Sequence, residues 1–288
     1  MNFDKILCLT SVILGVLLMG VNLFGLTQSI RKPGLGKNDL DNLRFIPKHV
    51  WDYKKSFEAI EDLSTISDVQ ILVQKANKIS NISLIHVEWE KVDPNQYRQL
   101  VPVWENFFLY AIGSFSGLPQ FERYHYANFY RNIRRGIGIC GDAATVLSSI
   151  LDKYNIENQI VAFEGHVIVE AQIYRKKELF DPDFGVSLGI SLAELLGNPG
   201  KVRVSYLKAG YSKEDVDYLL EIYNRKYKVF DSVYHFMSLR YIFEEISYVA
   251  KWVLPFFLVS IPFYRRFGRS ITRKGVHALL KRNKVANS

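Results

Sequence analysis

The sequence predicts an α+β domain held between two apolar segments at the ends of the chain. Of its 288 residues, 48% are hydrophobic and 14% aromatic, which is enough for a packed core. Residues 57–115 place apolar side chains mostly at helical spacing, whereas residues 157–181 alternate with a period of two, as strands do. Helices followed by a run of strands are typical of the α+β class.

The formal net charge of +8 is concentrated at the C-terminus. Residues 246–288 contain nine Lys or Arg and no acidic residue, which leaves 28 basic and 29 acidic residues in the rest of the chain. The body of the protein is therefore nearly neutral. This distribution argues against a nucleic-acid-binding domain, and no nucleic-acid partner is expected.

The chain has two cysteines, Cys8 in an apolar N-terminal segment and Cys140 in the body. A disulfide between them is not expected. The sequence has no CxxC motif and no paired Cys/His spacing, so no metal site is predicted. It also lacks a phosphate-binding glycine loop and a dinucleotide motif, and no cofactor is predicted.

Both ends of the chain contain candidate membrane segments. Residues 6–26 are 21 residues without a charge, long enough to span a bilayer. The alternative is a cleaved signal peptide, but the apolar stretch is long and no small-x-small cleavage site follows, which favours a retained anchor. Residues 246–264 contain Lys251 and two prolines, so they predict either a transmembrane helix or a shorter interfacial helix.

Charge next to these segments predicts the topology. Eight Lys or Arg lie between residues 265 and 284, and such clusters gather on the cytoplasmic side, where they also contact anionic lipid. We therefore expect both termini in the cytoplasm and residues 27–245 outside it. Arg31, Lys32 and Lys37 favour the opposite orientation, but they are the smaller cluster. The predicted organisation is an anchor (1–26), a mostly helical part (27–125), a core with a helical extension (126–245), a membrane helix (246–264) and a basic cytoplasmic tail (265–288).

The stretch "RRGIGICGDAATVLSSIL" (134–151) places Cys140 at the start of a predicted helix. Apolar residues recur there at three- and four-residue intervals, and glycines 136, 138 and 141 precede or begin the helix. A thiol at a helix N-terminus lies near the positive end of the helix dipole and near free backbone N–H groups, which favour the thiolate and can bind an oxyanion. The alternative is a buried, inert cysteine.

A base and an acid follow Cys140 in the order that a catalytic triad requires. His166 begins a predicted strand with one apolar face and one mixed face, and Asp181 ends the next strand at Pro182. The spacings are 26 and then 15 residues. A thiolate nucleophile needs a base, and the base needs an orienting group. Asp183 is the reserve for Asp181, and Glu170 is expected to be a structural strand residue.

These motifs together resemble the core of the transglutaminase-like superfamily, which is related to papain-like cysteine proteases. The resemblance covers about 60 residues, from "CGDAA" through "GHVIVE" to "FDPDFG". It implies an α+β core in which the helix bearing the cysteine packs on an antiparallel sheet bearing the histidine and the aspartate. It also implies that Cys140 is the nucleophile, His166 the base and Asp181 the residue that orients the imidazole.

The resemblance implies a membrane-anchored cysteine enzyme, either a protease or amidase (a hydrolase) or an acyltransferase. Its expected chemistry is acyl transfer or amide hydrolysis through a thioester, on an envelope protein or peptide substrate. The alternative is a membrane-anchored binding or assembly module that keeps the fold without turnover. The side chain that completes the oxyanion hole is not identified by the resemblance. Asn128, Tyr130 and Asn132 are alternative candidates.

Overall fold

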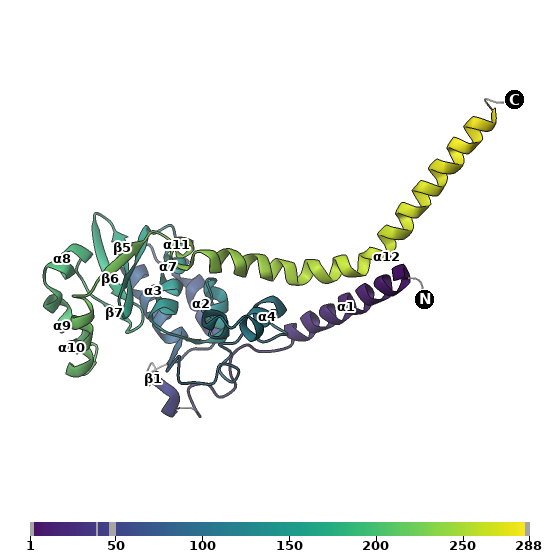
Figure 1. The fold of residues 1–288 in the computed structure, drawn as a ribbon. Coiled ribbons are helices and arrows are strands. Elements are labelled where there is room, and N and C mark those ends of the chain that lie inside the picture. The colour runs from purple at the N-terminus through teal and green to yellow at the C-terminus, as the bar shows by residue number, and fades with distance from the viewer. Residues whose placement is uncertain (1–2, 39, 46–49, 286–288) are drawn as a thin grey trace. The chain divides into compact units, whose positions relative to one another are not determined.

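The computed structural model describes residues 3–38, 40–45 and 50–285, the last of these as backbone only beyond residue 264. The chain forms two compact units (Figure 1). One comprises residues 29–102 and 109–245 and is here called the soluble unit. The other comprises residues 1–28, 103–108 and 246–288 and is called the helical-hairpin unit. Helices and sheets in the soluble unit confirm the α+β class.

The soluble unit contains an antiparallel five-stranded sheet in the order β7-β6-β5-β4-β8. Two tight hairpins connect its three central strands, as the alternating pattern predicts. The turn between β5 and β6 falls at residues 174 and 175, where Tyr174 takes the left-handed conformation (φ 52°), and the chain resumes as a strand at Lys176. The strands are β4 (Asn158–Phe163), β5 (His166–Ile173), β6 (Lys176–Asp181), β7 (Val186–Ser187) and β8 (Tyr227–Phe230).

Both faces of β5 are buried. Val169 and Ala171 pack in a core that includes the helix α7 (Cys140–Lys153), while Ile168 packs in a second core with residues of α9 (Arg203–Lys208) and α10 (Lys213–Ile222). The mixed face of this strand, which carries His166 and Glu170, is therefore buried as well as the apolar face. Helices that follow the strands in sequence cover this mixed face.

Most of the helices on the α7 side come from residues upstream of Cys140, and α11 from downstream. The helix α3 (Val69–Ser83) begins at Asp68, whose side chain accepts from the backbone N–H of Ile71 at 3.0 Å, and it packs in the same core as α7. The expectation of a mostly helical 57–115 segment holds only in part, because residues 84–106 form one short strand and loops. The other helices are α2 (Tyr53–Asp62), α4 (Phe107–Phe115), α5 (Pro119–Glu122), α6 (Phe129–Arg135), α8 (Leu192–Gly197) and α11 (Val233–Met237), with 3-10 turns η1 (Leu40–Asn42), η2 (Leu63–Thr65) and η3 (Pro199–Val202).

A second, three-stranded sheet lies next to the start of α7. Its strands are β1 (Leu43–Phe45), β2 (Ile85–Val87) and β3 (Ile137–Gly138), in that order. The central strand pairs in parallel with β3, so that His86 is opposite Gly138. This pairing brings a residue far upstream in sequence to the loop that precedes Cys140.

The helical-hairpin unit pairs α1 (Phe3–Leu26) with the distal part of α12 (Leu239–Val285). At Gly15 the helices approach so closely that a β-carbon would lie 2.8 Å from the carbonyl oxygen of Pro255. Asn22 donates to the carbonyl of Lys251, whose ammonium in turn donates to the carbonyl of Glu105, each at 2.5 Å. These two hydrogen bonds link α1, α12 and the 103–108 segment within this unit.

Two helices, Lys5–Leu26 and Leu239–Tyr264, are long and apolar enough to cross a membrane. The second begins seven residues earlier than residue 246, and the helix continues without a break to Val285. The helix is therefore longer than the 246–264 segment that the sequence indicated. Both helices favour membrane association, as expected from the sequence.

Candidate active site

The glycines before Cys140 have different structural roles. Gly136 ends α6 in the left-handed conformation (φ 73°) and donates its N–H to the carbonyl of Asn132 at 2.8 Å. At Gly138, a β-carbon would lie 2.7 Å from Cβ of Asp142 and 3.1 Å from Cδ1 of Leu84. The chain can therefore turn from α6 into α7 only with glycine at 138. Cys140 is the first residue of α7.

A buried ion cluster fixes the start of α7. The carboxylate of Asp142 accepts from the backbone N–H of Ile139 at 3.0 Å and lies 2.8 Å from Nδ1 of His125. Arg135, also fully buried, lies 3.9 Å from the same carboxylate and donates to the carbonyl of Tyr124. Burial alone raises the pKa of Asp142, but His125 and Arg135 outweigh burial and lower it. The guanidinium of Arg135 is therefore buried next to Asp142 and does not face solvent.

His166 is presented by the β4–β5 hairpin. Its turn residue Gly165 has φ 117°, a conformation that favours glycine, and His166 directly follows. The Nε2 atom of His166 lies 2.7 Å from Oδ2 of Asp181, and the thiol of Cys140 lies near enough to the imidazole to influence its pKa. Because Asp181 occupies Nε2, Nδ1 is the ring nitrogen that remains for a thiol. The structure thus brings the three predicted residues together, from α7, β5 and β6.

The surroundings of His166 favour its charged form. The side chain is 2% exposed, and burial by itself lowers the pKa of an imidazole. The carboxylate of Asp181 and the thiol of Cys140 act in the opposite direction and are stronger. Together they raise the pKa of His166 well above its ordinary value of 6.5.

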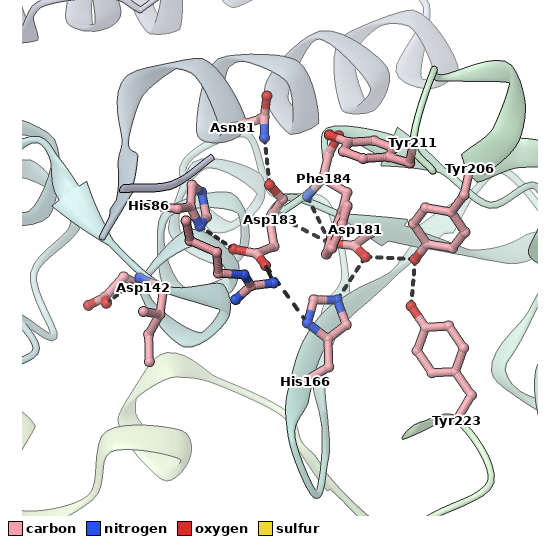
Figure 2. Close-up of polar contacts among 12 residues, drawn as sticks. Asn81, His86, Asp142, His166, Asp181, Asp183, Phe184, Tyr206, Tyr211 and Tyr223 are labelled. Atoms are coloured by element: carbon pink, nitrogen blue, oxygen red, sulfur yellow. Dashed lines mark hydrogen bonds and ion pairs between the residues drawn. The ribbon is translucent and has the colours of Figure 1, made fainter. Parts of the chain in front are cut away.

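Asp181 is held by donors from several segments (Figure 2). Its Oδ1 accepts from the backbone N–H groups of Asp183 and Phe184 at 3.0 and 3.2 Å. Its Oδ2 accepts from His166 and, at 2.6 Å, from the hydroxyl of Tyr206. The turn after β6 therefore orients the carboxylate that orients the imidazole.

Asp183 lies on the other side of the imidazole (Figure 2). Its Oδ2 is 3.9 Å from Nδ1 of His166 and 3.2 Å from Nη2 of Arg44, and its Oδ1 is 2.5 Å from Nδ1 of His86. Asn81 donates to its carbonyl at 2.7 Å. Burial raises the pKa of Asp183, but His86, His166 and Arg44 reverse the effect and hold the pKa at about 2.

The remaining candidates have structural contacts. The carboxylate of Glu170 accepts from the backbone N–H of Leu192 at 2.7 Å, as a structural strand residue would. Of the oxyanion-hole candidates, Asn128 caps α6 through the N–H of Tyr130, and the amide of Asn132 donates to the carbonyl of Tyr126. The Tyr130 ring packs against Phe57. These contacts are made within or next to α6. None of them joins one of the three candidates to Cys140.

Sequence reasoning missed His86, Tyr206 and Tyr223. Each is almost fully buried and reaches the site from a segment without a recognisable motif: β2, α9 and the end of α10. Only the folded chain brings them to the turn after β6, so no local pattern could have identified them.

A cavity of about 440 Å³ adjoins His166. Arg44, Phe184 and Leu219 contribute to its wall. Its volume lies in the range of sites that hold small ligands or side chains. Within the described residues, no group of three or more His, Cys, Asp and Glu side chains is arranged to bind a metal ion.

Comparison with protein-family models, with curated proteins and with solved structures finds no match to this chain.

Proposed function

We propose that this protein is a membrane-anchored cysteine enzyme with a transglutaminase-like, papain-related core. It performs acyl transfer or amide hydrolysis on an envelope protein or peptide. The observation that carries the proposal is the arrangement around one imidazole: His166 bonds Asp181 through Nε2, and Cys140, at the first position of a helix, lies near enough to influence the pKa of the imidazole.

In the first half of the reaction, the Cys140 thiolate attacks the carbonyl carbon of an amide and forms the S–C bond. Backbone N–H groups in the first turn of α7, which begins at Cys140 and leaves them without helical partners, stabilise the oxyanion. The His166 imidazolium then gives its Nδ1 proton to the leaving nitrogen as the C–N bond breaks. An amine leaves, and the acyl group stays on Cys140 as a thioester.

In the second half, neutral His166 takes a proton from water or from an amine as that nucleophile attacks the thioester. The C–S bond breaks, and the product is an acid or a new amide. Asp181 stays ionised throughout and stabilises the imidazolium that is present at the start of the first half-reaction and forms again in the second. Whether hydrolysis or cross-linking results depends on which nucleophile reaches the thioester.

The terminal helices keep this reaction at a membrane. In the proposed topology, α1 and α12 both cross the bilayer, the soluble unit lies outside the cytoplasm, and the basic tail contacts cytoplasmic lipid. The supporting observations are the length and composition of the two helices and the basic cluster that follows the second.

The test uses the purified full-length chain in detergent with a peptide library and a fluorescent primary amine, followed by mass spectrometry. Cys140→Ala and His166→Ala should each abolish peptide cleavage and amine incorporation, because nucleophile and base act as a unit. Cys8→Ala is the matched control and should keep full activity. If a Cys140→Ala protein at normal abundance fully complements a deletion strain, the proposal is wrong and the assembly module is favoured.

A further inference from the structure

A chain of two phenol groups ends on the carboxylate that orients His166. The hydroxyl of Tyr206 lies 2.6 Å from Oδ2 of Asp181, and the hydroxyls of Tyr206 and Tyr223 lie 2.5 Å apart (Figure 2). Both tyrosines are at most 1% exposed. They belong to the helical extension 203–223, which the reaction described above does not use.

The direction of the hydrogen bonds follows from the available protons. An ionised carboxylate can only accept hydrogen bonds, so the one hydroxyl proton of Tyr206 is donated to Asp181. Tyr223 must then donate to the oxygen of Tyr206. The chain therefore runs from Tyr223 through Tyr206 to Asp181, and each donor polarises the next.

The hydroxyl groups have a cost that phenylalanine would avoid. The ring of Tyr206 packs in an apolar core with Leu195, Val202 and Val216. A buried hydroxyl is unfavourable unless it is hydrogen-bonded, and packing alone requires only the ring. The hydrogen bond to Asp181 is therefore the interaction that tyrosine makes at position 206 and phenylalanine could not.

Tyr206 and His166 share one acceptor atom, Oδ2 of Asp181. A donor at that oxygen withdraws charge that would otherwise stabilise the imidazolium. We propose that Tyr206 and Tyr223 are positioning residues that fix Asp181 and set how tightly His166 holds its proton. This inference rests on the proposed Cys140–His166 chemistry and adds to it a part of the fold, the α9–α10 extension, that tunes the base.

The groups that face His166 come from every element around it. Those that lie against the imidazole or its carboxylates are Cys140 on α7, Asp181 and Asp183 after β6, Tyr206 on α9, Tyr211 in the α9–α10 loop, Tyr223 after α10, Arg44 on β1 and His86 on β2. His86 and Arg44 pair with Asp183. Burial raises the pKa of the buried phenols Tyr206 and Tyr223 well above 10.0, so neither phenol ionises near neutral pH.

The experiment measures the pH dependence of iodoacetamide alkylation of Cys140 in full-length Cys8→Ala protein. A thiolate–imidazolium pair gives two steps: a lower one as the thiolate forms and an upper one as His166 loses its proton. Tyr206→Phe should move the upper step to higher pH by ~0.5–1 unit, because Oδ2 then binds the Nε2–H more strongly. Tyr223→Phe should move it in the same direction by less, and the double variant no further than Tyr206→Phe alone.

Tyr211→Phe is the matched control. It removes a hydroxyl from the same extension, but that hydroxyl donates to the carbonyl of Phe184 and not to Asp181, so the upper step should stay in place. An upper step that does not move, or moves down, in Tyr206→Phe and Tyr223→Phe overturns the inference. If Tyr206→Phe does not fold, Tyr223→Phe alone decides. A single ordinary thiol titration in the Cys8→Ala parent would instead refute the proposed function.

Discussion

His86 and Asp183 form a fully buried pair, with Nδ1 of the histidine 2.5 Å from Oδ1 of the aspartate. Asp183 follows Asp181 by two residues, yet it faces the opposite nitrogen of His166. The imidazole therefore has a carboxylate near each ring nitrogen, one that bonds it directly and one whose charge is shared with His86 and Arg44. The pair from β2 and the turn after β6 joins the two sheets beside the candidate site.

The acid stability of the protein should depend on Asp183. Its pKa is about 2 in the folded protein against an ordinary 3.8, so its contribution is fully present above pH 3.8 and is lost as the pH falls toward 2. That contribution is on the order of 2 kcal/mol. Urea unfolding followed by circular dichroism should show a smaller loss of stability between pH 4.5 and 2 in Asp183→Asn than in the wild type.

Asp217→Asn is the control for this measurement. Asp217 is an exposed carboxylate on α10 paired with Arg203, and such surface pairs contribute little to stability. It should keep the wild-type pH dependence. If Asp183→Asn also keeps it, the burial of Asp183 beside His86, His166 and Arg44 does not stabilise the fold as described.

The two glycines that flank Cys140 should respond differently to alanine. At Gly138 the new methyl group would lie 2.7 Å from Cβ of Asp142, so the start of α7 must shift. We expect Gly138→Ala to lower stability by roughly 1–3 kcal/mol and to slow alkylation of Cys140. At Gly141 the methyl group would meet Phe236 at 3.6 Å, an ordinary contact, within a helix. Gly141→Ala should keep or slightly raise the unfolding temperature. Equal loss in both variants would contradict the packing described around Gly138.

The sequence identified the parts of the site that lie in one continuous stretch. Strands 158–181 and the helix from Cys140 followed from the period of their apolar residues, and Cys140, His166 and Asp181 from their order. The residues that hold Asp181 and Asp183 in place could not be predicted. Tyr206 and His86 reach the turn after β6 only through tertiary packing, and their own segments carry no motif. The burial of both faces of β5 was missed for the same reason: residues 199–223, which cover one face, do not reveal in sequence what they pack against.

Packing at Gly15 should determine whether the two terminal helices associate. A side chain there would lie 2.8 Å from the carbonyl of Pro255, whereas nothing lies within 4 Å of a β-carbon at Gly20. Gly15→Leu should lower the thermal stability of the helical-hairpin unit in detergent, measured by the fluorescence of Trp104 and Trp252, which both belong to it. Gly20→Leu is the control and should unfold at the wild-type temperature. A Gly15→Leu protein as stable as this control would contradict close packing of α1 on α12.

The proposed topology is tested by proteolysis of intact spheroplasts that carry the protein with a tag at Ser288. Protease should cut within residues 27–245 and spare the tag, because the basic cluster at 265–284 keeps the C-terminus in the cytoplasm. Detergent-permeabilised spheroplasts serve as the control, and there both regions should be cut. Protection of the soluble unit with loss of the tag would reverse the orientation.

The most direct test of the central claim is the reactivity of Cys140 with and without His166. The Cys8→Ala protein has Cys140 as its one remaining thiol, so iodoacetamide uptake at pH 6, followed by intact mass, reports on that residue alone. If Cys140 and His166 form a thiolate–imidazolium pair, the Cys8→Ala protein should react at least about tenfold faster than the Cys8→Ala/His166→Ala protein, since an ordinary thiol is almost fully protonated at that pH. Equal rates in two folded proteins, or no labelling of Cys140 in either, would contradict the account.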